Sequence, residues 1–93
     1  MSELSSKDKA TLRGMAQNLK PKAHVGKNGL SEGFLRELKF TFKSEDLVKI
    51  GFKGTREEIE ALIEGIEKAT DSQCVGGVGK RRSFYRELVE EES

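Results

Sequence analysis

The sequence predicts an α+β fold in which three helices and a four-stranded sheet form a two-layer sandwich. Segments with apolar residues at helical spacing alternate with short segments of strand character, in the order helix, strand, helix, strand, helix, strand, strand. Each helical segment has a single apolar stripe, which suits packing against one face of a sheet. The 93 residues, 34% of them hydrophobic, suffice for one domain with a modest core, expected over about residues 7–86.

The first helix is expected to begin near Ser5 or Ser6, because Ser5 and Asp8 have the spacing of a capping box. Pro21 disfavours helical backbone at the residue before it and therefore ends the element. The apolar stripe, at spacings of three and four, consists of Leu12, Met15, Ala16 and Leu19.

A short strand over residues 23–25 precedes the loop Gly26–Gly29, and Ser31 is the expected N-cap of the second helix. Phe40 is expected to be a partly covered surface aromatic; contact with a base or a partner is the alternative. The buried stripe of this helix consists of Phe34, Leu35, Leu38, Thr41 and Phe42.

Residues 47–53 alternate between apolar and basic side chains, which predicts a half-buried strand and a sheet with one half-open face. The apolar set is Val48, Ile50 and Phe52, and the basic set is Lys49 and Lys53. Thr55 and Glu58 form a capping box, so the third helix is expected to begin there. The core stripe of that helix consists of Ile59, Leu62, Ile63 and Ile66.

The formal net charge is only +1, but the charges are segregated along the chain. Residues 1–56 carry a net charge of +6 and residues 72–86 carry +4, whereas residues 57–71 carry −5 and the expected acidic tail, residues 87–93, carries −4. Local basic blocks, rather than net charge, attract a polyanion. Chance segregation on solvated faces is the plain alternative. The acidic third helix is expected to lie on the side away from such a ligand.

Several function classes find no support in the sequence. No apolar run approaches the length of a membrane span and the N-terminus lacks an apolar signal segment, so we expect a cytoplasmic protein without a membrane partner. The single cysteine, Cys74, excludes an internal disulfide and a cysteine metal cage. The only histidine, His24, has no evident catalytic partner. We expect no enzyme, cofactor, metal or small-molecule substrate; a small enzyme using His24 or Cys74 is an open alternative.

The loop Gly26–Gly29 and the helix start after it have the character of an anion site. Glycines let backbone approach a ligand closely, and the first N–H groups of a helix attract phosphate. The basic side chains around the loop are Lys20, Lys22 and Lys27, with Asn28 beside the last. The glycine-rich loop of a nucleotide-binding P-loop is missing, and a simple Asn-Gly turn is the plain alternative.

A second basic block lies in a predicted C-terminal hairpin, with strands at residues 72–78 and 81–86 and a turn at Gly79-Lys80. Cations and aromatic side chains are interleaved there, as on many nucleic-acid-binding surfaces. The cations are Lys80, Arg81, Arg82 and Arg86, and the aromatics are Phe84 and Tyr85. The alternative is that Phe84 belongs to the core and the arginines only solubilise the edge.

Five motifs occur in a specific order along the chain. They are Leu12-Arg13-Gly14, Leu19-Lys20-Pro21, Val25-Gly26-Lys27-Asn28-Gly29-Leu30-Ser31-Glu32-Gly33, Gly79-Lys80 and Tyr85-Arg86. In this combination the chain resembles the CRM domain, the chloroplast RNA splicing and ribosome maturation module, from about Lys7 to Arg86. Its size is similar to that of the bacterial stand-alone YhbY-type members. The departures from the family pattern are Gly51 within a strand and Gly76, Gly77, Arg82 and Ser83 in the hairpin.

The resemblance implies a non-catalytic RNA-binding protein whose sheet is mixed, similar to the C-terminal domain of translation initiation factor three. It implies that the loop Gly26–Gly29 contacts RNA, by likeness to KH domains. It also implies a target in ribosomal RNA of large-subunit (pre-50S) precursors and a role in ribosome assembly. A protein-interaction adaptor acting through the acidic third helix, Phe40 and the tail is the alternative. The residues predicted to bind RNA are Lys20, Lys22, Gly26, Lys27, Asn28, Gly29, Lys80, Arg81, Arg82 and Arg86.

Overall fold

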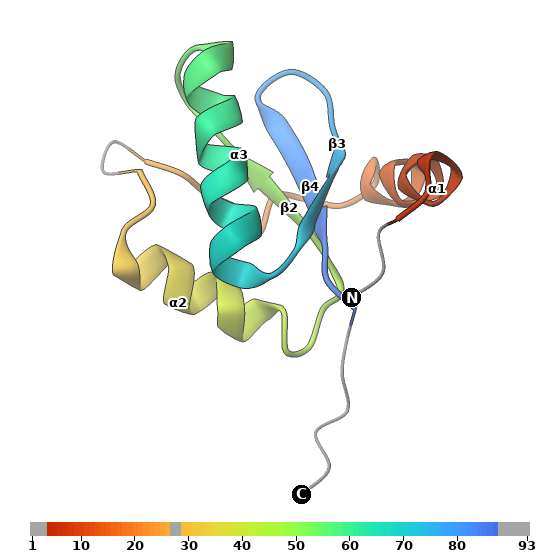
Figure 1. Cartoon of the computed structure of the whole chain (residues 1–93), viewed down its shortest axis with the longest axis horizontal. Helices are drawn as coiled ribbons and strands as arrows, with labels where there is room; N and C mark the ends of the chain where they lie inside the picture. Colours follow the sequence, from red (N-terminus) through yellow and green to blue (C-terminus); the bar gives the residue numbers. More distant parts are fainter. Residues whose placement is uncertain (1–3, 27–28, 88–93) are drawn as a thin grey trace, which may run out of the picture.

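The computed structural model of the chain describes residues 4–26 and 29–87. Its elements, in chain order, are α1 (Ser6–Ala16), β1 (Ala23–His24), α2 (Glu32–Thr41), β2 (Leu47–Gly51), α3 (Arg56–Thr70), β3 (Gln73–Gly76) and β4 (Arg81–Tyr85) (Figure 1). The predicted order of helices and strands is confirmed, and each strand is one to three residues shorter than expected.

The four strands form one mixed sheet in the order β1-β2-β4-β3. β1 runs parallel to β2, and the other neighbouring pairs are antiparallel. His24 of β1 pairs with Gly51 of β2, which pairs with Arg81 of β4. The carboxyl ends of β1 and β2 and the amino end of β4 therefore meet at one end of the sheet, which we call the loop end.

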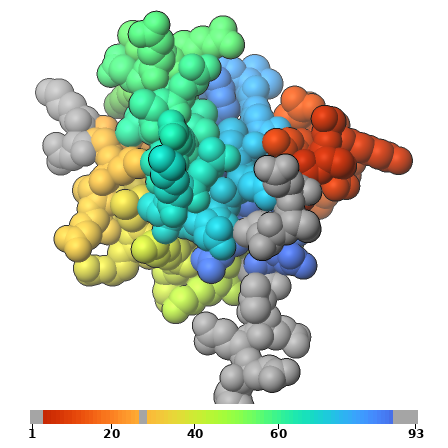
Figure 2. Space-filling model, in the orientation of Figure 1, coloured from red at the N-terminus to blue at the C-terminus, as the bar shows by residue number. Residues whose placement is uncertain are grey.

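Helices α2 and α3 pack on one face of the sheet, and Figure 2 shows α3 covering it from the viewed side. Val48, Ile50 and Phe84 are completely buried, with an exposed fraction of 0%. The core cluster consists of Val25, Leu38, Phe42, Val48, Ile50, Phe52, Ile59, Ile66 and Phe84. The sheet and these two helices form the predicted sandwich. The acidic α3 packs on the sheet face that carries the hydrophobic core.

Helix α1 lies against the opposite face of the sheet, beside β3 and β4 (Figure 1). Lys49 alternates with the core residues of β2, and its Nζ donates to the carbonyl oxygen of Ala16 at 3.3 Å. Ser83, the register partner of Lys49 in β4, is buried on the same face. The face that was expected to be half open is therefore partly covered by α1.

The helices begin where the sequence predicts. Both capping boxes are formed, by Ser5 with Asp8 before α1 and by Thr55 with Glu58 before α3. The hydroxyl oxygen of Ser31 accepts a hydrogen bond from the backbone N–H of Phe34 at the start of α2. These side chains satisfy N–H groups that a helix start leaves unpaired, which explains why short sequence signals located them well.

The apolar stripe predicted for the first helix is wrong at two positions. Helix α1 ends at Ala16, before Pro21, so Leu19 lies beyond it and is 38% exposed. Met15 is 60% exposed, and Ala16 is the buried residue of the helix. The last turn of α1 is fixed to the sheet by a lysine hydrogen bond rather than by a broad apolar stripe. In α2, by contrast, Phe40 is 72% exposed, as expected for a surface aromatic.

Candidate nucleic-acid interface

A groove of about 570 Å³ lies between α1 and the β3–β4 hairpin. Four cations line it, namely Arg13, Lys49, Lys80 and Arg81. Among its lining residues in the described part of the chain there is no carboxylate. Cations with like neighbours and no acid between them produce a strongly positive local potential, so the groove has the electrostatic character of a polyanion site.

Two glycines of the hairpin allow this groove to form. A Cβ atom at Gly76, which has φ +111°, would lie 2.6 Å from Cδ of Arg13, so the arginine side chain occupies the space that a larger residue would fill. A Cβ atom at Gly77 would overlap the carbonyl oxygen of Arg81 across the hairpin. Gly76 and Gly77 therefore allow one groove cation and the hairpin backbone to pack closely.

Arg82 serves the hairpin turn. Its Nη1 atom donates to the carbonyl oxygen of Gly79 and, at 2.9 Å, to that of Arg81. In the register it pairs with Ile50, whereas Arg81 pairs with Gly51, so the two arginines leave β4 on opposite faces. The structure thus places Arg81 in the groove and Arg82 at the turn.

The loop Gly26–Gly29 follows β1 after one intervening residue, Val25. The N–H of Gly29, which has φ +64°, donates to the carbonyl oxygen of Gly26 at 3.0 Å, and the N–H of Ser31 donates to Gly29 at 3.1 Å. Leu30 packs against α3, where a Cβ atom at Gly65 would lie 2.6 Å from its Cδ1. The residue after the loop, Leu30, is therefore held in place by its packing against α3. The predicted site residues Lys27 and Asn28 lie outside the described residues.

The loop and the hairpin turn lie at the same end of the sheet, although they are far apart in sequence. The N–H of Val25 donates to Gly51 at 2.9 Å, and the N–H of Phe52 donates to Lys80 at 2.7 Å. β1 and β4 flank β2, so they are separated by two strand spacings, roughly 10 Å. The exposed Lys53 follows β2 between them. Among the described residues, the loop end therefore brings together cations from two separate segments, Lys53 after β2 and Lys80 with Arg81 at the hairpin.

Arg86 lies at the other end of β4, five residues from Arg81 and thus roughly 17 Å along the strand. Its backbone N–H donates to Asp46 at 2.9 Å, before β2 begins. The surroundings there are acidic: burial raises the pKa of the Tyr85 hydroxyl, and so do the carboxylates of Asp46, Glu87 and Asp8. The structure does not bring Arg86 together with the other predicted site residues.

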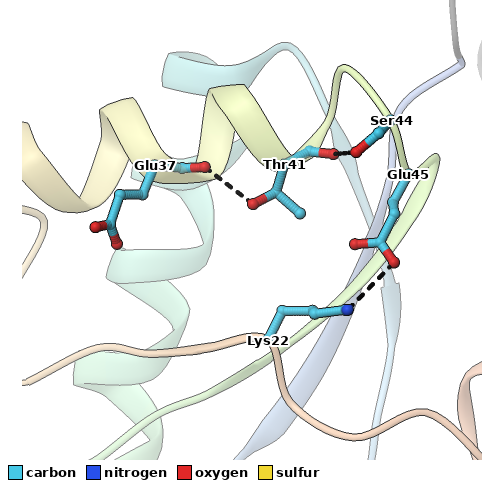
Figure 3. A network of polar contacts seen from close by, with 5 residues as sticks. All are labelled: Lys22, Glu37, Thr41, Ser44 and Glu45. Carbon is cyan, nitrogen blue, oxygen red and sulfur yellow. Dashed lines mark hydrogen bonds and ion pairs between the residues drawn. The ribbon is translucent and has the colours of Figure 1, made fainter.

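Lys20 and Lys22 lie between α1 and β1, and both are exposed. The ammonium of Lys22 points toward Glu45 and forms an ion pair with it at 3.3 Å (Figure 3). Glu45 follows the end of α2, where the hydroxyl of Ser44 donates to the carbonyl oxygen of Thr41 (Figure 3). Lys22 thus has an acidic partner already, which reduces the positive potential that it can offer a ligand.

Sequence reasoning missed Arg13 and Lys49 as site residues. The signal for Lys49 was present, because the alternation of residues 47–53 placed it on the face away from the core. Nothing local linked it to Arg13, since the two meet only when α1 packs across the sheet. The groove is a product of tertiary structure.

The candidate catalytic residues have different surroundings. Cys74 packs against the core, and burial raises the pKa of its thiol. His24 is exposed beside Gly51. In residues 4–26 and 29–87, no group of three or more histidine, cysteine or acidic side chains could hold a metal ion. No helix within those ranges has the length and apolar character needed to cross a membrane.

The chain is similar to known proteins over nearly all of its length. Residues 4–86 match the family model described as the CRS1/YhbY (CRM) domain. An RNA-binding protein of Haemophilus influenzae is 34% identical over 87 residues, which cover 92% of this chain and 88% of the relative. A probable RNA-binding protein of Pseudomonas aeruginosa is 30% identical over 84 residues, covering 89% of this chain and 81% of the relative.

A solved structure has the same fold. It is the solution structure of a hypothetical protein from Staphylococcus aureus, for which RNA binding has been suggested. It matches with a TM-score of 0.84 and 28% sequence identity, over 97% of this chain and 95% of that one. The predicted fold and the family resemblance are thus both confirmed, and the chain belongs to the CRS1/YhbY (CRM) domain family.

Proposed function

We propose that this protein binds RNA through the phosphate backbone at the loop end of its sheet. The observation that carries the proposal is the groove beside α1, lined by four cations and, in the described part of the chain, by no carboxylate. Binding there would release counterions from the nucleic acid. The names of the H. influenzae and P. aeruginosa relatives support RNA over other polyanions.

The loop and the groove have complementary roles in this proposal. Backbone N–H groups of the loop Gly26–Gly29 and the first turn of α2 bind one phosphate. The groove cations and Lys53 bind neighbouring phosphates. We also propose RNA contacts for four other predicted residues, namely Lys20, Lys27, Asn28 and Arg82. Lys22 and Arg86 contribute least, because Lys22 is paired with Glu45 and Arg86 lies at the end of β4 away from the groove.

Ribosomal RNA in precursors of the large subunit is the target that we propose. The protein would assist ribosome assembly in the cytoplasm without catalysing a reaction, as the family resemblance implies. Phosphate contacts carry little sequence information, so selectivity comes from RNA shape and exposed loop bases. Cross-linking in cells, followed by sequencing of the bound RNA, should recover mainly ribosomal RNA. Recovery mainly of messenger RNA would contradict this target.

The binding surface can be tested with two variants that remove equal charge. Lys80→Gln with Arg81→Gln should lower the slope of log affinity against log salt by about 1.5 to 2. Lys22→Gln with Arg86→Gln removes the same charge away from the groove and should leave the slope nearly unchanged. RNA titrations at several salt concentrations measure both. Equal losses in the two variants would contradict the placement, and an affinity insensitive to salt would contradict RNA binding through phosphates.

A further inference from the structure

The ring of His24 lies across the backbone of Gly51 in the neighbouring strand. A Cβ atom on Gly51 would lie 2.5 Å from Cδ2 of the ring, 3.0 Å from Nε2 and 3.5 Å from Cγ. Any larger residue at position 51 would therefore displace the imidazole. This contact gives a physical reason for a glycine inside a strand whose other residues are mostly apolar and bulky.

The ring is on the face of the sheet that carries the groove. Val25, the next residue in the chain, is buried in the core, so His24 points to the opposite face. Its register partners across the sheet are Gly51 and then Arg81. α1 packs mainly against β3 and also against β2 and β4, and His24 is exposed. No side chain in residues 4–26 and 29–87 hydrogen-bonds to the imidazole.

These observations place an exposed aromatic ring between the loop and the groove. Gly26 lies two residues after His24, and Arg81 lies in the same cross-strand row, roughly 10 Å away. A strand of RNA that spans the loop and the groove must pass over this ring. A planar ring supported from below by backbone loses little freedom when a base stacks on it, because its position is already set.

We propose that His24 is a stacking platform for one unpaired RNA base, and that Gly51 exists to seat it. This proposal rests on the proposed RNA binding. It adds that the RNA bound at His24 is single-stranded rather than duplex. Histidine is among the side chains on which splayed bases stack in RNA recognition. Bases inside a duplex are already stacked on their neighbours, so they cannot use the platform.

The test compares single-stranded with duplex RNA of equal length. His24→Ala should weaken binding of the single strand about tenfold and leave duplex binding unchanged. His24→Phe keeps an aromatic ring and should retain most of the affinity. The salt slope should be the same in all three proteins, because a stacking contact releases no counterion. Fluorescence anisotropy with labelled RNA measures each affinity.

A second variant, Gly51→Val, tests the same contact, because its side chain should displace the His24 ring without removing it. Its loss of single-strand binding should match that of His24→Ala, and the double variant should lose no more than either alone. Thermal unfolding of each variant checks that the fold is retained. If Gly51→Val does not fold, His24→Ala against His24→Phe decides the question alone.

Distinct outcomes separate this proposal from the one on which it rests. A wild-type protein that binds no RNA overturns both. Steep salt dependence in the wild type together with unchanged affinity in His24→Ala overturns only the stacking platform. Equal losses for single-stranded and duplex RNA would show that the contact does not need an unpaired base and would also overturn it. A His24→Phe variant as weak as His24→Ala would show that the imidazole acts through its nitrogens, with the same consequence.

Discussion

The two faces of the central sheet divide stability from recognition. One face carries Val48, Ile50 and Phe84, which α2 and α3 remove completely from water. The other carries Lys49, Arg81 and His24, which α1 covers only in part. The alternation of side chains along a strand sends neighbouring residues to opposite faces, so a single strand supplies both the core and the groove. Substitutions at adjacent positions should therefore have separable effects.

The largest effect is expected on the apolar face. Phe84→Ala removes a completely buried ring that packs near Phe52. It should lower the free energy of unfolding by about 3–5 kcal/mol, because the cavity adds to the lost transfer energy. Urea denaturation measures the loss. The affinity of the remaining folded protein for RNA should match the wild type; a matching loss of affinity would show that the two faces are not independent.

The next effect is expected at the hairpin that borders the groove. Gly77→Ala forces a methyl group into the Arg81 carbonyl and should cost about 1–3 kcal/mol of stability. Gly14→Ala is a matched control in α1, because a Cβ atom there meets nothing within 4 Å. In a helix that change should stabilise by about 0.5–1 kcal/mol. Thermal unfolding compares the pair, and a Gly77→Ala variant as stable as the wild type would contradict the close approach at Gly77.

Lys49 contributes both to stability, through its hydrogen bond to Ala16, and to the cationic groove. Its substitution should therefore affect stability and RNA binding together. Lys49→Met keeps the apolar stem but loses the hydrogen bond to Ala16, and it should cost about 1 kcal/mol of stability. It should also lower the salt slope of RNA binding by about 1. Lys53→Met, at an exposed position two residues after β2, should change the slope alone. An equal loss of stability in both variants would contradict a stabilising role for the hydrogen bond from Lys49 to Ala16.

The sequence predicted local structure far better than the groove. Ser5, Ser31 and Thr55 start helices through contacts within three residues, so their effect is readable without a fold. The groove depends instead on β4 pairing with β2, which brings Arg81 beside Gly51 from thirty positions away. Arg86 was grouped with Arg81 because they share a segment, yet the strand carries it to the acidic end of the sheet.

The smallest effect is expected where the cationic face meets a carboxylate. Glu45→Gln removes the ion-pair partner of Lys22. Exposed ion pairs contribute about 0–1 kcal/mol, so the stability should fall by less than 1 kcal/mol. RNA affinity should rise slightly at low salt, because a negative charge has been removed from beside the binding face, and the gain should vanish as salt screens it.

The matched control for that change is Glu60→Gln on α3. Glu60 also pairs with a cation, Arg56, at 3.7 Å, but it lies on the helix that covers the apolar face. The two variants lose the same charge and a similar exposed ion pair, so they should have similar stabilities. Only Glu45→Gln should improve RNA binding at low salt. Because long-range repulsion would act on both variants alike, equal gains would mean that net charge, and not the cationic face, governs the attraction to RNA.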